Sequence, residues 1–544
     1  MEANTKSNYA YSLPKKQVIT VMVGTMLALF LSSLDQTVVG TAMPRIITDL
    51  GGFSQYTWVT TIYIITSAIA TPVTGKLTDM FGRKIFFIIG VSLFTLASLA
   101  CGFSQNMLQI IIFRGLQGIG SGMISINAFT IIADIFPPTQ LVKYQGYMSS
   151  VFGLSSVLGP TLGGFLTDAL SWHWVFFINV PLGVLILILF ICFFPDIQPD
   201  KRKHRIDYWG VTLLVLTVVP LMLALTYGGS MYPWGSAYII GLFAFAATML
   251  ILLIQVERHA AEPILPKELF TNAIIINVNI IQFIGSMGQF SVITFLPLFF
   301  QGVLGASATM SGNYMIPMSL GMLAGAMLAG QVLSLIKGHY RILGAAGNAL
   351  ACVGILLLSR IDVNTSYLYI VVWSTIAAFG LGSGFPIYTV ALQNAVPRKM
   401  LGVATSSGPF FRSIGGAVGL AIMGSILNNR FAMEFISQVP ADIQAVVSPE
   451  KLSEISQNPQ ALVNSGALPQ LQALIGQAGS QAEAMVQEVL HALRLALSSS
   501  ISLVFLIAVA FGLIATGFAC FTKEIPLRDH NNLPQPENDS HKSK

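Results

Sequence analysis

Three charged side chains stand inside long apolar stretches and could carry proton chemistry: Asp35, Arg114 and Arg412. Asp35 lies in "LFLSSLDQTVVGTAMPRI", residues 29–46, near the far end of an apolar run that begins at Val18. A charge inside hydrocarbon is costly, so such residues usually pair or line a water-filled path. At about 1.5 Å per helical residue, all three fall in the outer half of a core about 30 Å thick. One acid and two bases at similar depth predict a buried network.

A buried carboxylate responds to two opposing influences, because burial disfavours its charged form and a neighbouring guanidinium favours that form. A conformational change that alters either influence makes the carboxyl group take up or release a proton. Asp35 is therefore the predicted proton carrier and Arg114 its modulator. Two roles stay open for Arg412, that of a coupling residue and that of a structural hydrogen-bond clamp. The alternative for Asp35 is that it simply ends a helix at the membrane interface.

The composition places these residues in a membrane protein. The chain has 544 residues, of which 54% are hydrophobic and 9% are charged, and its mean hydropathy is +0.72. Soluble domains carry roughly 25% charged residues. The four cysteines lie in apolar runs and their spacing fits no zinc site. No metal, cofactor or nucleic-acid partner is predicted, and the lack of a nucleotide loop or nucleophile elbow disfavours an enzyme.

Apolar runs of roughly 20 residues, the length that crosses the hydrocarbon core, predict an all-α integral membrane protein. We expect fourteen spans, at about 18–40, 58–77, 84–103, 107–133, 144–167, 174–194, 207–227, 237–256, 272–300, 311–336, 341–359, 367–390, 401–427 and 497–521. Lys and Arg gather in alternate connecting segments, as cytoplasmic loops do. Both termini are therefore predicted to be cytoplasmic, in a cell membrane. The run from Val18 is expected to be retained, because no small-residue cleavage signal follows it.

An internal repeat divides the spans into two sets of six. "GIGSGMISINAFTIIADIFP" from Gly118 matches "GLGSGFPIYTVALQNAVP" from Gly380, and "VLGPTLGGFL" from Val157 matches "AVGLAIMGSI" from Ala417. Transporters are commonly built from such repeats, with the substrate site between them. The predicted units are a cytoplasmic N-terminus (1–17), a six-helix bundle (18–200), two inserted helices (201–270), a second six-helix bundle (271–521) and a cytoplasmic tail (522–544). The long loop 428–496 is expected outside, as a solvated cap rather than a partner-binding site.

The loop "GKLTDMFGRK", residues 75–84, resembles the signature loop of the major facilitator superfamily. The matching residues are Gly75, Asp79, Gly82, Arg83 and the adjoining Lys84. An acid at this turn can meet the exposed N–H groups of a helix N-terminus. The resemblance implies that the partner of Asp79 is the start of the span near Leu401, and that Arg83 pairs with Asp134. Such contacts would hold the cytoplasmic side closed. The alternative is a basic anchor with incidental acids.

Three further stretches, "LDQTVVGTAMP", "RGLQGIGSG" and "GPTLGGFLTD", are similar to motifs of the 14-span drug:proton antiporters of this superfamily. The resemblance implies a major facilitator fold and a coupling role for Asp35 and Arg114. In "GPTLGGFLTD", Gly159, Gly163 and Gly164 offer small residues for close helix packing and Pro160 adds a kink. We expect this helix at the interface between the two halves. Plain packing without gating is the alternative.

The expected activity is proton-coupled export of lipophilic or cationic drugs by alternating access, by a monomer. Walls rich in Gly, Met and aromatic residues suit lipophilic substrates of variable shape. Candidate polar or aromatic contacts in the cavity are Trp58, Asn127, Gln289, Asn313 and Tyr388, and helix packing is the alternative for each. Export of lipids or lipophilic metabolites is the competing function. A nutrient importer is disfavoured by the "GPTLGGFLTD" motif, and a channel by the repeat and the gating loop.

Overall fold

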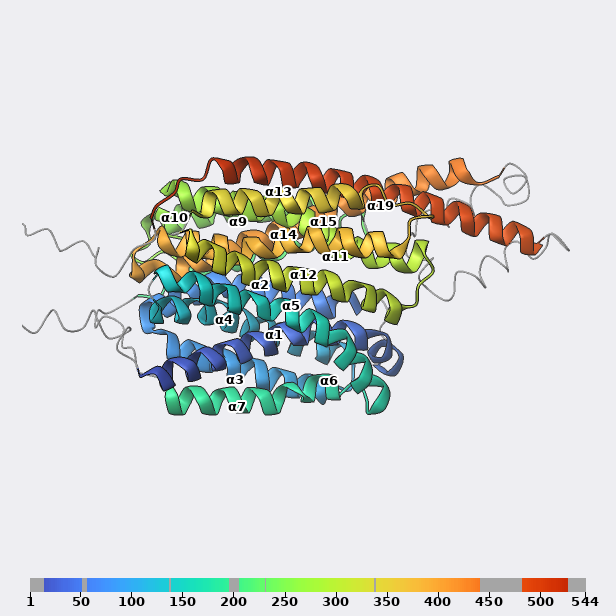
Figure 1. Ribbon diagram of the computed structural model, residues 1–544. Coiled ribbons are helices and arrows are strands. Elements are labelled where there is room, and N and C mark those ends of the chain that lie inside the picture. Colours follow the sequence, from blue (N-terminus) through green and yellow to red (C-terminus); the bar gives the residue numbers. More distant parts are fainter. Residues whose placement is uncertain are drawn as a thin grey trace, which may run out of the picture.

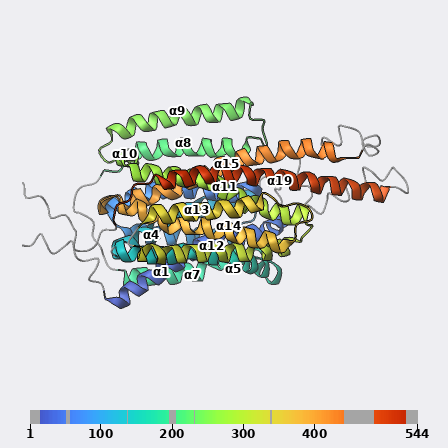
Figure 2. The same cartoon turned by 45° about the horizontal axis from the view of Figure 1, so that its top comes forward.

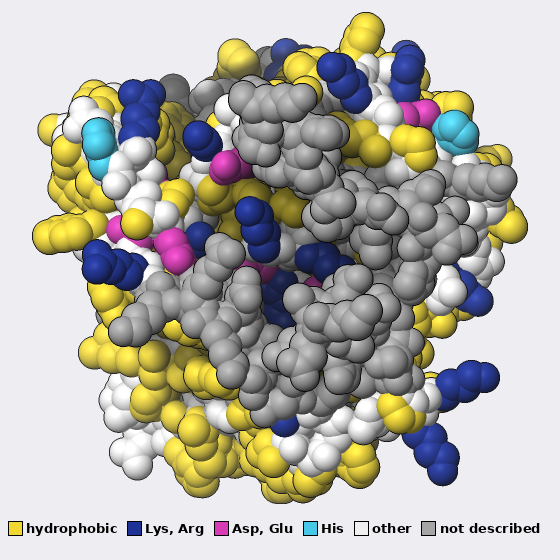
Figure 3. All heavy atoms as spheres, turned by 90° about the vertical axis from the view of Figure 1, so that its left-hand side faces the viewer, with side chains coloured by type: hydrophobic (Ala, Val, Ile, Leu, Met, Phe, Trp, Pro, Cys, Tyr) yellow, Lys and Arg dark blue, Asp and Glu magenta, His cyan; other side chains and the backbone are white. Residues whose placement is uncertain are grey.

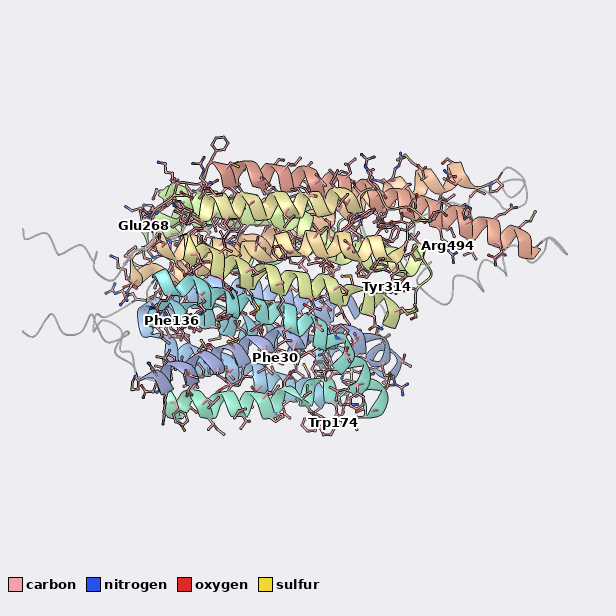
Figure 4. All side chains as sticks on the ribbon, in the orientation of Figure 1. Phe30, Phe136, Trp174, Glu268, Tyr314 and Arg494 are labelled. Carbon is pink, nitrogen blue, oxygen red and sulfur yellow. The ribbon has the colours of Figure 1, made fainter. Side chains whose placement is uncertain are left out.

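The computed structural model describes residues 14–50, 56–136, 138–194, 205–229, 231–336, 339–440 and 482–526. These residues form a bundle of long helices that run nearly parallel to one another (Figure 1). The first described helix begins and the last one ends at the same side of the bundle (Figure 1). We call this side the terminal end and the opposite side the distal end. In Figure 4, Phe136 and Glu268 mark the terminal end, Tyr314 and Arg494 the distal end, and Phe30 lies between them.

The first half of the chain forms six crossings. They are α1 (Lys15–Leu50), α2 (Tyr56–Phe81), α3 (Arg83–Gly102), α4 (Met107–Ile135), α5 (Pro138–Ala169) and a sixth crossing that is broken into α6 (Trp174–Phe177) and α7 (Asn179–Phe193). The second half repeats the pattern. Its helices are α11 (Ala273–Leu298), which continues into the π-helical turn η3 (Phe299–Val303), then α12 (Ala308–Leu335), α13 (Tyr340–Leu358), α14 (Tyr367–Asn394), α15 (Leu401–Gln438) and α19 (Ala482–Cys520).

Two inserted helices, α8 (Tyr208–Tyr227) and α9 (Ala237–His259), connect the halves. They form a separate layer on one flank, with α9 outermost and α8 against α15 and α2 (Figure 2). The short turns α10 (Glu268–Thr271) and η4 (Arg398–Met400) lead into α11 and α15. Thirteen helical stretches among the described residues are long and apolar enough to cross a membrane. The hydroxyl-rich α2 is a further helix of 26 residues inside the bundle. The all-α membrane fold is thus confirmed, and the predicted count of fourteen is supported to within one helix.

Five helix starts, those of α4, α8, α9, α11 and α12, are capped by the residue that precedes them. Asn106, Asp207, Ser236, Asn272 and Ser307 each accept a hydrogen bond from a backbone N–H in the first turn of the helix that follows them. Such caps satisfy N–H groups that have no partner within the helix. The start of α15 differs, because its preceding residue, Met400, offers no capping side chain.

The described parts of the segment 428–496, predicted as an external loop, are largely helical. α15 runs to Gln438 and α19 begins at Ala482, while residues 441–481 lie outside the described residues. At 1.5 Å per residue the 38 residues of α15 span about 57 Å, well beyond a core of about 30 Å. The two helices project past the distal end side by side (Figures 1 and 2). Buried Phe431, Phe435, Val486 and Leu490 pack in one hydrophobic cluster there, which explains why both helices continue.

The repeat is visible in the packing, with a register of 260 residues. A Cβ atom on Gly120 would meet the backbone of Gly90 and Phe94 in α3, and one on Gly380 would meet Gly347 and Ala351 in α13. Two residues later, Gly122 lies against α2 and Gly382 against α12 in the same way. The match of Gly118 with Gly380 is therefore two residues out of register. The 260-residue offset of the Val157 and Ala417 pair agrees with the structure.

Candidate functional site

A cluster of charged side chains joins the two halves at the terminal end. Asp79, near the end of α2, accepts hydrogen bonds from the backbone N–H groups of Gly402 and Val403, both at 2.9 Å. Arg83, at the start of α3, lies 2.6 Å from Asp79 and 3.0 Å from Asp134 at the end of α4. The Asp79 and Arg83 side chains are only 4% and 8% exposed. Both contacts that the sequence implied are therefore present.

Asp79 supplies the cap that α15 lacks. The first turn of α15 has unpaired N–H groups and the positive end of the helix dipole, and no side chain before it accepts from them. The carboxylate that fills this role comes from the other half of the chain. The cap must therefore be lost whenever the halves separate at this end. Figure 3 views this end of the molecule and shows Lys and Arg side chains around its middle, with acidic side chains among them.

Two glycines of the signature loop are required by geometry. A Cβ atom on Gly75 would lie 2.6 Å from the carbonyl oxygen of Gly402, and one on Gly402 would lie 2.2 Å from the carbonyl oxygen of Gly75. Only glycine allows α2 and α15 to approach so closely. Gly82 has a φ of 96°, a backbone conformation that other residues rarely adopt, and it makes the turn between α2 and α3.

An uncharged bridge, which was not predicted from the sequence, also crosses between the halves. Gln145 of α5 donates to the side-chain oxygen of Gln393 in α14 at 3.1 Å. Gln145 also donates to the carbonyl oxygen of Phe129 at 3.1 Å, and Gln393 donates to Thr405 of α15 at 3.2 Å. Gln145 and Gln393 are 0% and 5% exposed. The sequence signal was a polar amide at the start of one predicted span and another just after the end of a second span, in opposite halves of the repeat.

Asp35 and Arg114 form an ion pair deep inside the first half. The guanidinium Nη1 of Arg114 donates to Oδ2 of Asp35, and the two residues are both 1% exposed. Arg114 also donates to the side chain of Gln117 at 2.9 Å and lies over the ring of Tyr63, 4.1 Å from its centroid. Because Asp35 is buried and paired with Arg114, it does not simply end a helix at the membrane interface.

Two amides complete the surroundings of Asp35. Gln117 and Asn179 each donate to Oδ1 of Asp35 at 2.9 Å. Asn179, the first residue of α7, also donates to the hydroxyl oxygen of Ser98 at 3.0 Å. Neither amide was predicted from the sequence as a partner of Asp35. Gln117 could have been found three residues after Arg114 on the same helix, whereas nothing local connects Asn179 with Asp35.

Arg412 does not join this network, which corrects the prediction of a three-charge cluster. Its guanidinium lies over the ring of Phe385 in α14, 4.4 Å from the ring centroid. Among the described residues, the ion pair of Asp35 is with Arg114 alone. Depth along the membrane normal was predicted from residue counting. Such a depth does not say which helices are neighbours in the plane of the membrane. Arg412 belongs to α15, in the other half of the bundle. The cation–π contact gives Arg412 a local packing partner.

The small-residue motif of α5 packs inside the first half, not between the halves as expected. A Cβ atom on Gly159 would meet Thr37 of α1, and one on Gly163 would meet Thr41 and the carbonyl oxygen of Val38. Gly164 has open space around it. Thr37 donates to the carbonyl oxygen of Ser155 at 3.2 Å, close to the helix turn that Pro160 disturbs. The motif therefore packs α5 against the two helical turns of α1 that follow Asp35.

A different part of α5 contacts the second half. Gly146 approaches Gly330 and Ala326 of α12, and Gly153 approaches Leu323 of the same helix. Phe152 stacks with Phe385 across the same boundary, with ring centroids 6.2 Å apart. These contacts lie in the part of α5 nearest the terminal end. They extend the closure made by the charged cluster and the glutamine bridge.

The five predicted cavity residues come from five helices, and the structure places them differently. Trp58 packs edge-on against Tyr227 of α8, at the inserted layer. Tyr388 accepts a hydrogen bond from Asn348 of α13 at 2.8 Å, so both side chains serve helix packing in this conformation. Asn313 is exposed on α12 and Gln289 is buried on α11. The amide of Asn127 donates to Met123 of its own helix, while its buried oxygen has no hydrogen-bond partner.

Comparisons with known proteins agree with this architecture. The family model of the Major Facilitator Superfamily matches residues 25–420. Multidrug transporter protein MdtP of Bacillus subtilis (strain 168) is 38% identical over 524 residues, which cover 95% of each chain. Multidrug resistance protein 3 of the same organism is 38% identical over 491 residues, covering 90% of this chain and 92% of that one.

Solved structures show the same fold at low sequence identity. The human organic anion transporter MFSD10 (TETRAN) has a TM-score of 0.59 at 12% identity, and covers 92% of this chain and 100% of its own. The proton:xylose symporter XylE has a TM-score of 0.57 at 14% identity, over 94% and 97% of the two chains. The helical architecture, the family match and the full-length relatives together show that the chain belongs to the Major Facilitator Superfamily of membrane transporters.

Proposed function

We propose that this protein is a proton-coupled antiporter that exports lipophilic or cationic compounds by alternating access. The observation that carries the proposal is the buried Asp35–Arg114 pair, held away from solvent within one half of the transporter. A carboxylate in such a place changes its charge only when its surroundings change. Relatives named as multidrug transporters support drug efflux as the transport direction and substrate class.

Contacts between the halves gather at the terminal end, which supports a movement that opens and closes that end. The cap of Asp79 on α15, the Gln145–Gln393 bridge and the close approach of Gly146 to Gly330 would all be lost on opening. At the distal side, the motif glycines of α5 bind α1 within one half. The protein would therefore rock as two bodies, with its terminal side closed in the conformation described here.

The proposed location is a cell membrane with the terminal end in the cytoplasm. Basic side chains around that end (Figure 3) support this orientation, because cytoplasmic segments carry an excess of Lys and Arg. Protons and small lipophilic substrates would be the transported partners, and the surrounding lipids the medium of a monomeric transporter. No resident cofactor enters the proposed cycle.

Transport by purified protein in liposomes tests the proposal. An imposed proton gradient should drive accumulation of several chemically unrelated lipophilic dyes, and collapsing the gradient with an ionophore should stop it. Gradient-driven movement of a fluorescently labelled phospholipid, without dye transport, would favour the competing function of lipid export. Dye transport that is equally fast with and without the gradient would overturn proton coupling.

A further inference from the structure

We propose that Asn179 turns its side-chain amide when Asp35 takes up a proton, and so reports the proton state of Asp35 to the contact between α3 and α7. This inference rests on the proposed role of Asp35 as proton carrier. It concerns a positioning residue that does not itself titrate. The observations that carry it are the set of donors around Asp35 and one unpartnered oxygen.

Every hydrogen bond that the structure gives to the Asp35 carboxylate comes from a donor. Arg114 donates to Oδ2, and Gln117 and Asn179 donate to Oδ1. This arrangement suits an ionised carboxylate, which only accepts. A protonated carboxyl group is itself a donor and needs an acceptor. The described geometry is therefore that of ionised Asp35, and protonation requires a neighbour to change.

The other titratable or charged groups facing this site come from three helices. They are Arg114 of α4, Tyr63 of α2 and Cys101 of α3. Tyr63 donates its hydroxyl to the carbonyl oxygen of Ser32, and Cys101 points its sulfur at Gln117, 4.0 Å from the amide oxygen. In each of these contacts the group acts as a donor. Of the two amides that donate to Asp35, each also carries an oxygen that could accept.

The two amide oxygens differ in their partners. The oxygen of Gln117 accepts from Arg114 at 2.9 Å and is contacted by Cys101, so this amide is held in place. The oxygen of Asn179 is buried and has no hydrogen-bond partner. Rotation of the Asn179 amide by half a turn would present this oxygen to a protonated Asp35. A buried amide oxygen without a partner is costly, and this motion gives it one, while the amide nitrogen moves into the place that the oxygen leaves.

The rotation would be felt outside the immediate site. In the ionised state the amide nitrogen of Asn179 bridges Asp35 and the hydroxyl of Ser98 on α3. Ser98 in turn donates to the carbonyl oxygen of Phe176, just before the break between α6 and α7. Turning Asn179 withdraws its donor from Ser98 and loosens the contact of α3 with the start of α7. The proton state of Asp35 thereby reaches Ser98 of α3, to which Asp35 itself makes no direct hydrogen bond.

Infrared difference spectroscopy of the purified full-length protein, taken between high and low pH, tests this inference without a substrate. We expect a protonated-carboxyl band that is missing in Asp35→Asn. In protein with isotope-labelled asparagine side chains, an amide carbonyl band should move to lower frequency in step with it, because that carbonyl gains a hydrogen bond. The amide change should be absent from Asp35→Asn and Asn179→Leu. It should persist in Asn279→Leu, a matched loss of a buried helical asparagine on α11.

Comparison of the two amides gives a second readout. Gln117→Leu removes a donor that stabilises the ionised carboxylate more than the neutral carboxyl group, so it should raise proton affinity about tenfold, or about one pH unit in the midpoint of the carboxyl band. Asn179→Leu removes a partner of both states and should shift the midpoint by clearly less. Equal shifts, or a wild-type spectrum with a titrating carboxyl but no amide change, would overturn the turning of Asn179 and leave proton coupling intact. If no carboxyl band depends on Asp35, the proposed function itself fails.

Discussion

Two polar clusters, the charged cluster at the terminal end and the Asp35 network, use similar residues in opposite ways. The terminal cluster crosses between the halves, since Asp79 of α2 binds the backbone of α15. The Asp35 network stays within the first half, on α1, α2, α3, α4 and α7. The first therefore opposes separation directly. The second cannot hold the halves together, so in the proposed cycle it would act through its state of charge.

The difference shows how a transporter can separate two roles. We call the charged cluster at the terminal end the latch, and the Asp35 network the proposed sensor. A latch must bridge bodies that move apart, so its partners come from both sides and include main-chain groups whose position defines the helix. A sensor must keep its geometry while its charge changes, so it needs several donors on one rigid body. Removing one partner of a buried ion pair typically costs about 3–5 kcal/mol, so both clusters are sensitive to single substitutions.

The largest effect is expected from Asp35→Asn, which should abolish gradient-driven accumulation of dye in liposomes. An amide cannot take up and release the coupling proton, whereas its shape mimics a protonated carboxyl, so binding of substrate should survive. Glu488→Gln, at an exposed acid on α19, is the control and should transport normally. Undiminished proton release on substrate binding by Asp35→Asn would remove the distinction between sensor and latch.

A smaller but clear effect is expected at the latch. Asp79→Asn should slow transport several-fold in correctly inserted protein, because the amide has no charge for Arg83 and only one oxygen for the N–H groups of α15. The test is labelling of a cysteine at Ser406, a buried position beside Gly75, by a water-soluble maleimide applied from the terminal side. Labelling in a background without native cysteines should rise relative to the parent with Asp79. Equal labelling would contradict the latch.

Gly402→Ala separates packing from charge at the same place. The added Cβ would lie 2.2 Å from the carbonyl oxygen of Gly75, so closure should be hindered although Asp79, Arg83 and Asp134 all remain. We expect increased maleimide labelling at position 406, as for Asp79→Asn. A Gly402→Ala protein with unchanged labelling would show that the helices have room to adjust, and that the latch is purely electrostatic.

The packing of α5 against α1, the helix that carries Asp35, should depend on which motif glycine is changed. Gly163→Leu places a side chain against Thr41 and Val38 of α1 and should lower thermal stability and transport. Gly164→Leu, one residue later, enters open space and should be tolerated in a membrane environment. Melting temperatures of the two purified variants in the same detergent decide this. Equal losses would mean that the motif acts elsewhere than at α1.

The smallest effect is expected at the uncharged bridge. Gln145→Ala and Gln393→Ala should each raise labelling at position 406 by less than Asp79→Asn, because a neutral hydrogen bond is worth about 1 kcal/mol. The double variant should be less than additive, since the two side chains share one bond. Full additivity would indicate that the two glutamines stabilise the closed state separately, and the bridge would not count as part of the latch.

The sequence by itself determined the elements and the chemistry they carry. Hydropathy is a local property, so the apolar runs located the helices. The resemblance of the signature loop to that of the superfamily implied the partners of Asp79 and Arg83, and both contacts are present. The presence of an acid and a base in the outer half of the first bundle likewise indicated a buried pair, which is Asp35 with Arg114.

Only the tertiary structure decided which side chains of different helices contact one another. Arg412 was expected with Asp35, yet it packs on Phe385, because residue counting gives depth along a helix and not the identity of its neighbours. The α5 motif turned toward α1 and not toward the second half, because helix rotation is set by the packing of all faces at once. Asn179 reaches Asp35 across 144 residues of sequence, through a helix break that no local pattern predicts. Contacts between distant helices depend on the joint packing of the whole bundle, and a linear pattern does not contain that information.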